Sequence, residues 1–180
     1  MFYSRSLYIW DLVKDRIKTT QSIQEVGDWQ FIQLGNYTEV SPLNVTQGNK
    51  VKITFQEADI SYTAGNGFKL SYNFTDQKFE PTQLNDLFFS EIRFKTKCSK
   101  QNGHASVQVE VPTATFSPVQ ATTFGIPKAA NVEQFISLDG GMFVGQEMVD
   151  NGFEIYFEAE DGNFEIYDVS FLSSRLGSGK

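Results

Sequence analysis

The chain of 180 residues contains one cysteine and one histidine, and this scarcity excludes several kinds of site. Cys98 has no second cysteine in the chain with which to form a disulfide bond, and no CxxC or His-rich spacing accompanies it that would build a zinc site. A Ser-His-Asp or Cys-His constellation would have to use His104, which lies in a stretch, residues 100–104, that has the composition of a hairpin tip. We therefore predict no catalytic residues and expect that the protein is not an enzyme.

Long apolar runs are missing as well. The N-terminal residues MFYSRSLYIWD carry charges that interrupt every apolar stretch, so we expect neither a secretory signal nor a membrane span. No membrane partner is expected.

Basic residues are absent from a long part of the chain. Residues 131–171 contain ten Asp or Glu and no Lys or Arg, and this part accounts for the net charge of −7. Nucleic-acid binding requires a basic stripe that neutralises phosphates, often with aromatic residues on which bases stack. The sequence has no such stripe, so we expect no nucleic-acid partner.

The most acidic stretch, residues 150–171, reads DNGFEIYFEAEDGNFEIYDVSF and holds seven acidic residues. The apolar residues 153, 155, 157 and 159 share one phase, and the carboxylates at 154, 158 and 160 share the other. Such a period of two is typical of a half-buried strand with a wet face. We interpret the carboxylates as a solvent face rather than an acid/base pair, and we predict a hairpin that turns at Asp161-Gly162.

The same stretch contains a slip in phase. If Phe164 and Ile166 face the core, Val169 and Phe171 should face solvent, yet both are apolar. One extra residue near Tyr167-Asp168 would return them to the core, so we predict a β-bulge there. A bulge can re-aim a side chain, which makes Asp168 a candidate ligand for a structural calcium ion.

The remaining sequence favours an all-β fold. Phenylalanine is abundant, with 17 copies, and short alternating segments recur at 29–34, 50–56, 67–74, 91–96, 106–111 and 135–138. We predict a second hairpin over 91–111 with its tip at Asn102-Gly103, a long crossing connection over the proline-containing residues 112–128, and a turn at 139–141. We expect no helix in the body. These elements predict an antiparallel β-sandwich of jelly-roll type over 29–175, followed by a flexible tail at 176–180.

Residues 1–28 differ from the predicted sandwich and are expected to form an N-terminal arm or lead-in segment. Their apolar residues fit a helix approximately and fit an extended segment equally well. The aromatic residues Phe2, Tyr3, Tyr8 and Trp10 need a cover, which the sandwich itself or a neighbouring subunit would supply. They are our candidate assembly contacts.

Two resemblances bear on function. The run Phe164-Glu165-Ile166-Tyr167-Asp168-Val169-Ser170-Phe171 resembles the last strand of jelly-roll carbohydrate-binding modules, and residues 90–97 with 107–111 resemble the central strand pair of that family. That resemblance implies a calcium site at Asp168 and a possible glycan ligand. The whole organisation, a jelly roll with a short arm and an acidic body, also resembles the small decoration, cement or fibre-associated proteins of tailed-phage virions.

Three hypotheses follow from the sequence. The first is a non-enzymatic structural or interaction protein of a phage virion, located in the virion as a capsid decoration or a tail or fibre-associated subunit. It would bind other virion proteins and form a homo-oligomer, with a trimer as one possibility. The alternative is a carbohydrate-binding module or receptor-binding domain, which would show an exposed aromatic beside polar side chains in a groove. An enzyme would show convergent carboxylates in a pocket.

Overall fold

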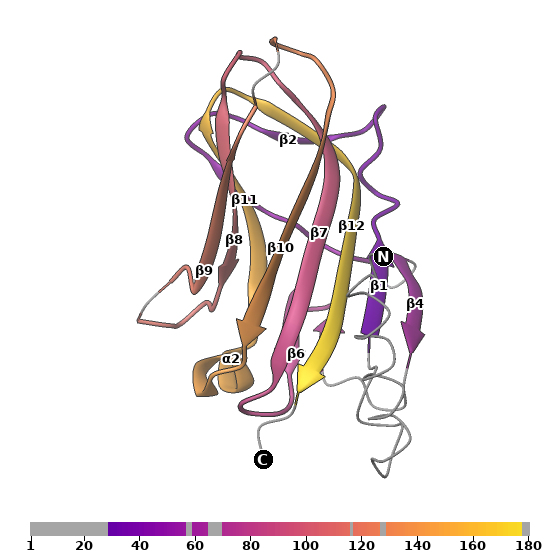
Figure 1. The fold of residues 1–180 in the computed structure, drawn as a ribbon, viewed down its shortest axis with the longest axis vertical. Coiled ribbons are helices and arrows are strands. Elements are labelled where there is room, and N and C mark those ends of the chain that lie inside the picture. The colour runs from indigo at the N-terminus through magenta and orange to yellow at the C-terminus, as the bar shows by residue number, and fades with distance from the viewer. Residues whose placement is uncertain (1–28, 57–58, 65–69, 116, 127–128, 178–180) are drawn as a thin grey trace, which may run out of the picture.

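Two β-sheets pack face to face in the computed structural model of the chain (Figure 1). The structure describes residues 29–177 except for 57–58, 65–69, 116 and 127–128, and it describes no side chains over 60–71. The predicted arm, with Phe2, Tyr3, Tyr8 and Trp10, lies outside the described residues. So do residues 178–180 of the predicted tail, whereas residues 176–177 of that tail form the end of a strand instead.

The first sheet contains six of the described strands. Its strand order is β10 (Gln134–Phe143), β7 (Leu87–Cys98), β12 (Phe164–Gly177), β1 (Trp29–Gln33) and β4 (Ile60–Ala64), and β2 (Leu43–Val45) pairs with the beginning of β12. The second sheet has the order β3 (Lys50–Lys52), β11 (Glu154–Asp161), β8 (His104–Glu110) and β9 (Gln120–Gly125). A short pair, β5 (Leu70–Asn73) and β6 (Lys78–Pro81), adjoins the second sheet through a bridge between Phe79 and Phe153.

Most connections carry the chain from one sheet to the other, although β1 and β2 follow one another in the first sheet and β8 and β9 follow one another in the second. β2, β7, β10 and β12 belong to the first sheet, whereas the strands that precede or follow them, β3, β8, β9 and β11, belong to the second. All the pairings are antiparallel. This arrangement is a jelly-roll β-sandwich, so the predicted fold class is confirmed.

The two predicted hairpins are wrong. β11 pairs with β3 and β8, whereas β12 pairs with β7, β1 and β2, so the turn at Asp161-Gly162 carries the chain from one sheet to the other. The connection through Asn102-Gly103 likewise joins β7 to β8 across the sandwich. A tight turn fixes a reversal of the chain but does not decide whether the next strand pairs with the previous one.

The two crossing connections pack on each other at one end of the sandwich. The backbone N–H of Ser99 donates to the carbonyl of Asn163 at 2.9 Å, and the N–H of Asn163 donates to the Ser99 hydroxyl at 2.9 Å. Gly162 has φ of 96°, and a β-carbon placed there would lie 2.7 Å from the buried Cys98 sulfur. Glycine is therefore required at this crossing for both conformation and space.

Alternation along β11 places its apolar residues between the sheets, as predicted. Phe153, Ile155, Phe157 and Ala159 are all buried, whereas Glu160 is exposed. The phenylalanine-rich composition fills the core with two aromatic clusters. One joins Phe55, Tyr72, Phe79, Phe153 and Phe171, and the other joins Phe94, Phe124, Phe157 and Phe164.

The predicted β-bulge is confirmed. The pairing of β12 with β7 shifts register between Tyr167 and Ser170, and Asp168 has φ of 51°. Because of this shift, Ile166, Val169 and Phe171 are all buried. The N–H of Asp168 is turned away from the ladder and donates to the carbonyl of Tyr37 at 3.0 Å.

Other local predictions need correction. Residues 139–141 lie inside β10 rather than in a turn, and residues 112–128 contain the strand β9 as well as a connection. A helix, α2 (Gln146–Asn151), lies between β10 and β11, where none was expected, and strands β2, β4 and β6 were not predicted. Strands of three to five residues and a six-residue helix are too short to establish a period in the sequence.

Candidate functional site

The carboxylates of Glu154 and Glu158 on the outer face of β11 are half-buried and paired. Lys52 lies 2.6 Å from Glu154, Lys50 pairs with Glu110 on β8, and the Gln108 amide donates to Glu158. The lysines belong to β3, the neighbour of β11 in the sheet. Carboxylates that are matched across strands in this way stabilise the sheet, so they lie on the outer face as predicted but are paired and half-buried rather than freely solvated.

The chain's one histidine lies on the surface, whereas its one cysteine is buried. His104 is exposed at the first position of β8, where it pairs in register with Gly125. Cys98 is buried, and its sulfur lies 3.9 Å from the carbonyl oxygen of Asp161. Within the part of the chain that the structure describes, no three His, Cys, Asp or Glu side chains gather as a metal site would require.

Asp168 lies at the bulge and points to solvent. Its carboxylate is 3.0 Å from the Lys95 ammonium, and its side chain is 52% exposed. Hydrogen bonding to Asp168 is the largest cause of a raised pKa for Lys95, which keeps this lysine charged. A neighbouring ammonium fits calcium poorly, because calcium takes six to eight oxygen ligands. Calcium at Asp168 stays a prediction, which a chelation experiment on the melting temperature would test.

The outer face of the first sheet carries several large apolar side chains near one end, of which Trp29, Phe31, Phe89 and Leu172 are half-buried. The register places Phe31 opposite Leu172, Trp29 and Phe89 on either side of Ser174, and Leu87 opposite Phe143. Leu87, Phe143 and Leu176 have exposed fractions of 39%, 60% and 61%. We call this set the apolar face; it consists of Trp29, Phe31, Leu87, Phe89, Phe143, Leu172 and Leu176.

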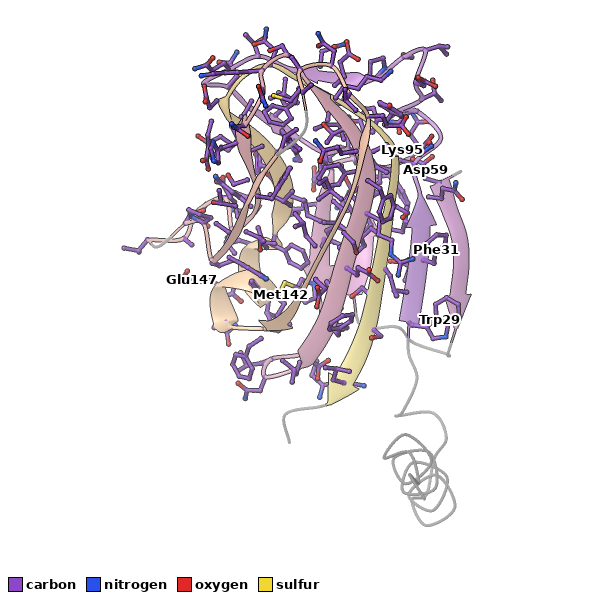
Figure 2. The ribbon with its side chains drawn as sticks, turned by 45° about the horizontal axis from the view of Figure 1, so that its top comes forward. Trp29, Phe31, Asp59, Lys95, Met142 and Glu147 are labelled. Carbon is purple, nitrogen blue, oxygen red and sulfur yellow. The ribbon has the colours of Figure 1, made fainter. Side chains whose placement is uncertain are left out.

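The apolar face occupies one end of the sheet. Figure 2 shows Trp29 and Phe31 following one another along β1, with Lys95 toward the other end. Further along β7 the outward residues become polar, with Glu91 held by Arg93 at 2.7 Å and by the Ser137 hydroxyl at 2.6 Å. Hydrogen bonding to Arg93 is the largest cause of a lowered pKa for Glu91, so this carboxylate stays ionised beside the apolar face.

Sequence reasoning missed the apolar face. On β10 the residues 135, 137, 139, 141 and 143 share one phase, and this phase contains two phenylalanines together with Ser137 and Asp139. The polar members indicate that this phase faces outward. The two phenylalanines could therefore have been predicted to lie on the surface. Phe135 and Phe143 are indeed 64% and 60% exposed.

A second feature is a polar hollow where β2 joins the sheet. It has a volume of about 270 Å³ and lies over the ends of β2, β7 and β12 and the turn at Asn131. The register aligns Asn44, Glu165 and Lys97 across three adjacent strands. We call this site the polar hollow; its polar side chains used below are Asn44, Thr46, Lys97, Asn131, Asn163 and Glu165.

Comparisons with known proteins give a likeness of fold. No protein-family model matches the chain, and no curated protein sequence matches it. Among solved structures, an Eiger TNF from S. frugiperda has a TM-score of 0.52 at 6% identity, covering 86% of this chain and 96% of its own. The PRD1 vertex protein P5 has a TM-score of 0.51 at 8% identity, covering 83% and 73%.

A third solved structure is the globular domain of the zebrafish complement 1qA protein. Its TM-score is 0.50 at 8% identity, and the match covers 84% of this chain and 99% of that domain. At such identities the likeness shows the jelly-roll fold alone. Within the described residues, no helix has the length and apolar character needed to cross a bilayer.

Proposed function

We propose that this protein is a structural or interaction subunit of a virion, acting as a capsid decoration or a tail or fibre-associated protein. It assembles with other copies of itself and with other virion proteins. The observation that carries this proposal is the exposure of Leu87, Phe143 and Leu176 in the apolar face, because monomeric proteins in water rarely leave large apolar side chains close together on one surface. The likeness to the PRD1 vertex protein P5 supports a virion role at the level of fold.

The apolar face has the composition of a protein interface. Aromatic residues are enriched in the buried centre of interfaces and charged residues are depleted there. Trp29, Phe31, Phe89 and Phe143 provide the aromatic centre, while Glu91 and Arg93 lie beside it as a polar rim. A sheet face repeated on every copy suits a closed, symmetric homo-oligomer, and a trimer is one possible form.

The test is the oligomeric state of the purified full chain, measured by analytical ultracentrifugation. We expect an oligomer for the natural chain and a monomer for Phe143→Glu and for Leu87→Glu, because a charge on the face must lose its water on association. Both residues are exposed, so their replacement leaves the core intact. Val40→Glu is the matched control, since Val40 is 95% exposed and lies outside the apolar face.

A monomeric natural chain, or glutamate variants that assemble as the natural chain does, would contradict the proposal. The alternative function is a carbohydrate-binding module or receptor-binding domain. The polar hollow favours this alternative, because it brings together several polar side chains that have no hydrogen-bond partner among the described residues. A virion protein that touches a glycan would combine both functions.

A further inference from the structure

The polar hollow is assembled by hydrogen bonds between segments that are distant in the sequence. The Asn163 side-chain oxygen accepts the N–H of Gln47 at 2.9 Å, and the Asn163 carbonyl accepts the N–H of Ser99 at 2.9 Å. The N–H of Asn131 donates to the carbonyl of Cys98 at 2.6 Å, and Asn131 has φ of 62°. These contacts fix the walls of the hollow before any ligand arrives, which lowers the entropic cost of binding.

Several polar groups in the hollow have no partner among the described residues. The Glu165 carboxylate, the Thr46 hydroxyl and the Asn131 side-chain amide form no hydrogen bond with that part of the chain. All three side chains are exposed. Glu165 supplies acceptors only, whereas the amide and the hydroxyl both donate and accept. A ligand in the hollow would therefore meet donors and acceptors from more than one direction.

The charges of the lining residues indicate which class of ligand the polar hollow can bind. An anion such as phosphate would be repelled by Glu165, and Lys97, the one cation among the described lining residues, already lies 2.9 Å from Glu39. A divalent cation would be repelled by Lys97 and would find a single carboxylate in the part of the hollow that the structure describes. An apolar ligand would bury these polar groups without hydrogen bonds, at a cost for each of them. What fits is a neutral molecule with many hydroxyl groups.

We propose that the polar hollow binds one neutral sugar ring, either free or at the end of a glycan. A hollow of about 270 Å³ is smaller than the range of about 300–1,000 Å³ typical of pockets for drug-sized ligands, so it suits a single ring. Vicinal hydroxyls both donate and accept, which matches a carboxylate flanked by amides. Buried Val45 and Phe164 line the hollow, and none of its described lining residues is an exposed aromatic, so we expect millimolar affinity.

This proposal rests on the alternative function above, a carbohydrate-binding module or receptor-binding domain, and it does not depend on self-assembly through the apolar face. Glu165 and Leu172 both point outward on β12, and the strand rise separates them by about 23 Å along the strand. A copy docked on the apolar face therefore leaves room for a ligand at the other end. A negative result for the polar hollow would not contradict self-assembly through the apolar face, and the reverse also holds.

The experiment is a titration of the isotope-labelled full chain with the methyl glycosides of glucose, galactose, mannose and N-acetylglucosamine, followed by NMR. We expect at least one sugar to shift the backbone amide signals of residues 44–46, 97–99 and 163–165. Glu165→Ala and Asn131→Gly should each weaken binding by about tenfold, the effect of losing one or two hydrogen bonds. Glycine keeps the left-handed backbone of Asn131, so this variant removes only the side chain.

Glu160→Ala is the matched control, because Glu160 is an exposed carboxylate at the end of β11 and does not line the hollow. It should bind the sugar as the natural chain does, and all variants should melt at similar temperatures. Sodium phosphate and calcium chloride serve as competing probes. The proposal is overturned if none of the four glycosides shifts these signals, if both hollow variants bind normally, or if phosphate or calcium shifts these signals and the sugars do not.

Discussion

At the scale of single residues, the alternation in β11 makes a direct prediction about stability. Phe157 is buried in contact with Phe94, Phe124 and Phe164, whereas Glu158 lies on the outer face and accepts a hydrogen bond from Gln108. Phe157→Ala should lower the free energy of unfolding by about 3–5 kcal/mol, because it leaves a cavity. Glu158→Ala should lower it by about 1 kcal/mol or less. Urea denaturation of both variants measures this difference, and equal losses would contradict the assignment of the two faces.

A second residue predicts how stability depends on pH. Burial, the largest cause, raises the pKa of Tyr72 to about 12, and its hydroxyl donates to Gln77 at 2.9 Å. Below pH 10 the hydroxyl is protonated in both states, so its contribution is fully present. As pH rises from about 10 through about 12, the unfolded chain ionises first and up to roughly 3 kcal/mol of stability is lost.

The measurement compares the natural chain with Tyr72→Phe in urea at increasing alkaline pH. Phenylalanine does not ionise, so stability should fall less steeply with pH in the variant, whatever the substitution costs at neutral pH. The pKa of Tyr167 is also raised to about 12 by burial, and this tyrosine is present in both proteins. Parallel curves for the two proteins would show that Tyr72 is not the group responsible.

At the scale of elements, the sequence predicted the bulge but not the two crossing connections. The bulge was predictable because Phe164, Ile166, Val169 and Phe171 must all be buried, and only an inserted residue makes that possible. The connection at Gly162 was predicted as a hairpin because a glycine turn between two alternating strands is compatible with either arrangement. The choice depends on Cys98 and Ser99, which are distant in the sequence and pack against the turn.

The crossing at Gly162 can be tested against a glycine that shares only its backbone conformation. Gly162 and Gly48 both have positive φ, at 96° and 78°, but nothing lies within 4 Å of a β-carbon placed on Gly48. Gly48→Ala should therefore cost only the conformational penalty, about 1–2 kcal/mol. Gly162→Ala adds a clash with the Cys98 sulfur and should cost at least about 1 kcal/mol more. Thermal unfolding of the two variants measures this difference. Equal melting temperatures would mean that a β-carbon fits at Gly162 without a clash.

At the scale of the whole molecule, composition predicted the jelly roll, but the candidate sites depended on strand order. Seventeen phenylalanines and alternating segments are enough to favour a sandwich. The apolar face exists because β1, β12, β7 and β10 are neighbours, and the polar hollow exists because β2 adds to β12. These neighbours come from parts of the chain far apart in the sequence, and periodicity within one strand contains no information about them.

The last prediction concerns residues 1–22 and the assembly of the full chain. We predict that Tyr3, Tyr8 and Trp10 are buried between copies or against a virion partner. Three such rings bury several hundred Å² of apolar surface, worth about 10 kcal/mol at 25 cal/mol per Å². This is the same order as the 4–15 kcal/mol that association costs. A chain that lacks residues 1–22 should keep its melting behaviour but fail to join the assembly.

The measurement is co-sedimentation of full-length and truncated protein with shells or tails that lack this subunit. A full-length chain with Tyr3, Tyr8 and Trp10 all replaced by serine is the matched control, because it keeps the length and charge of the segment. If both altered proteins lose binding, the rings themselves are the contact. If only the truncation loses binding, other residues of the segment carry it. Unchanged binding by the truncated chain would remove residues 1–22 from the interface and leave the apolar face to provide the contact.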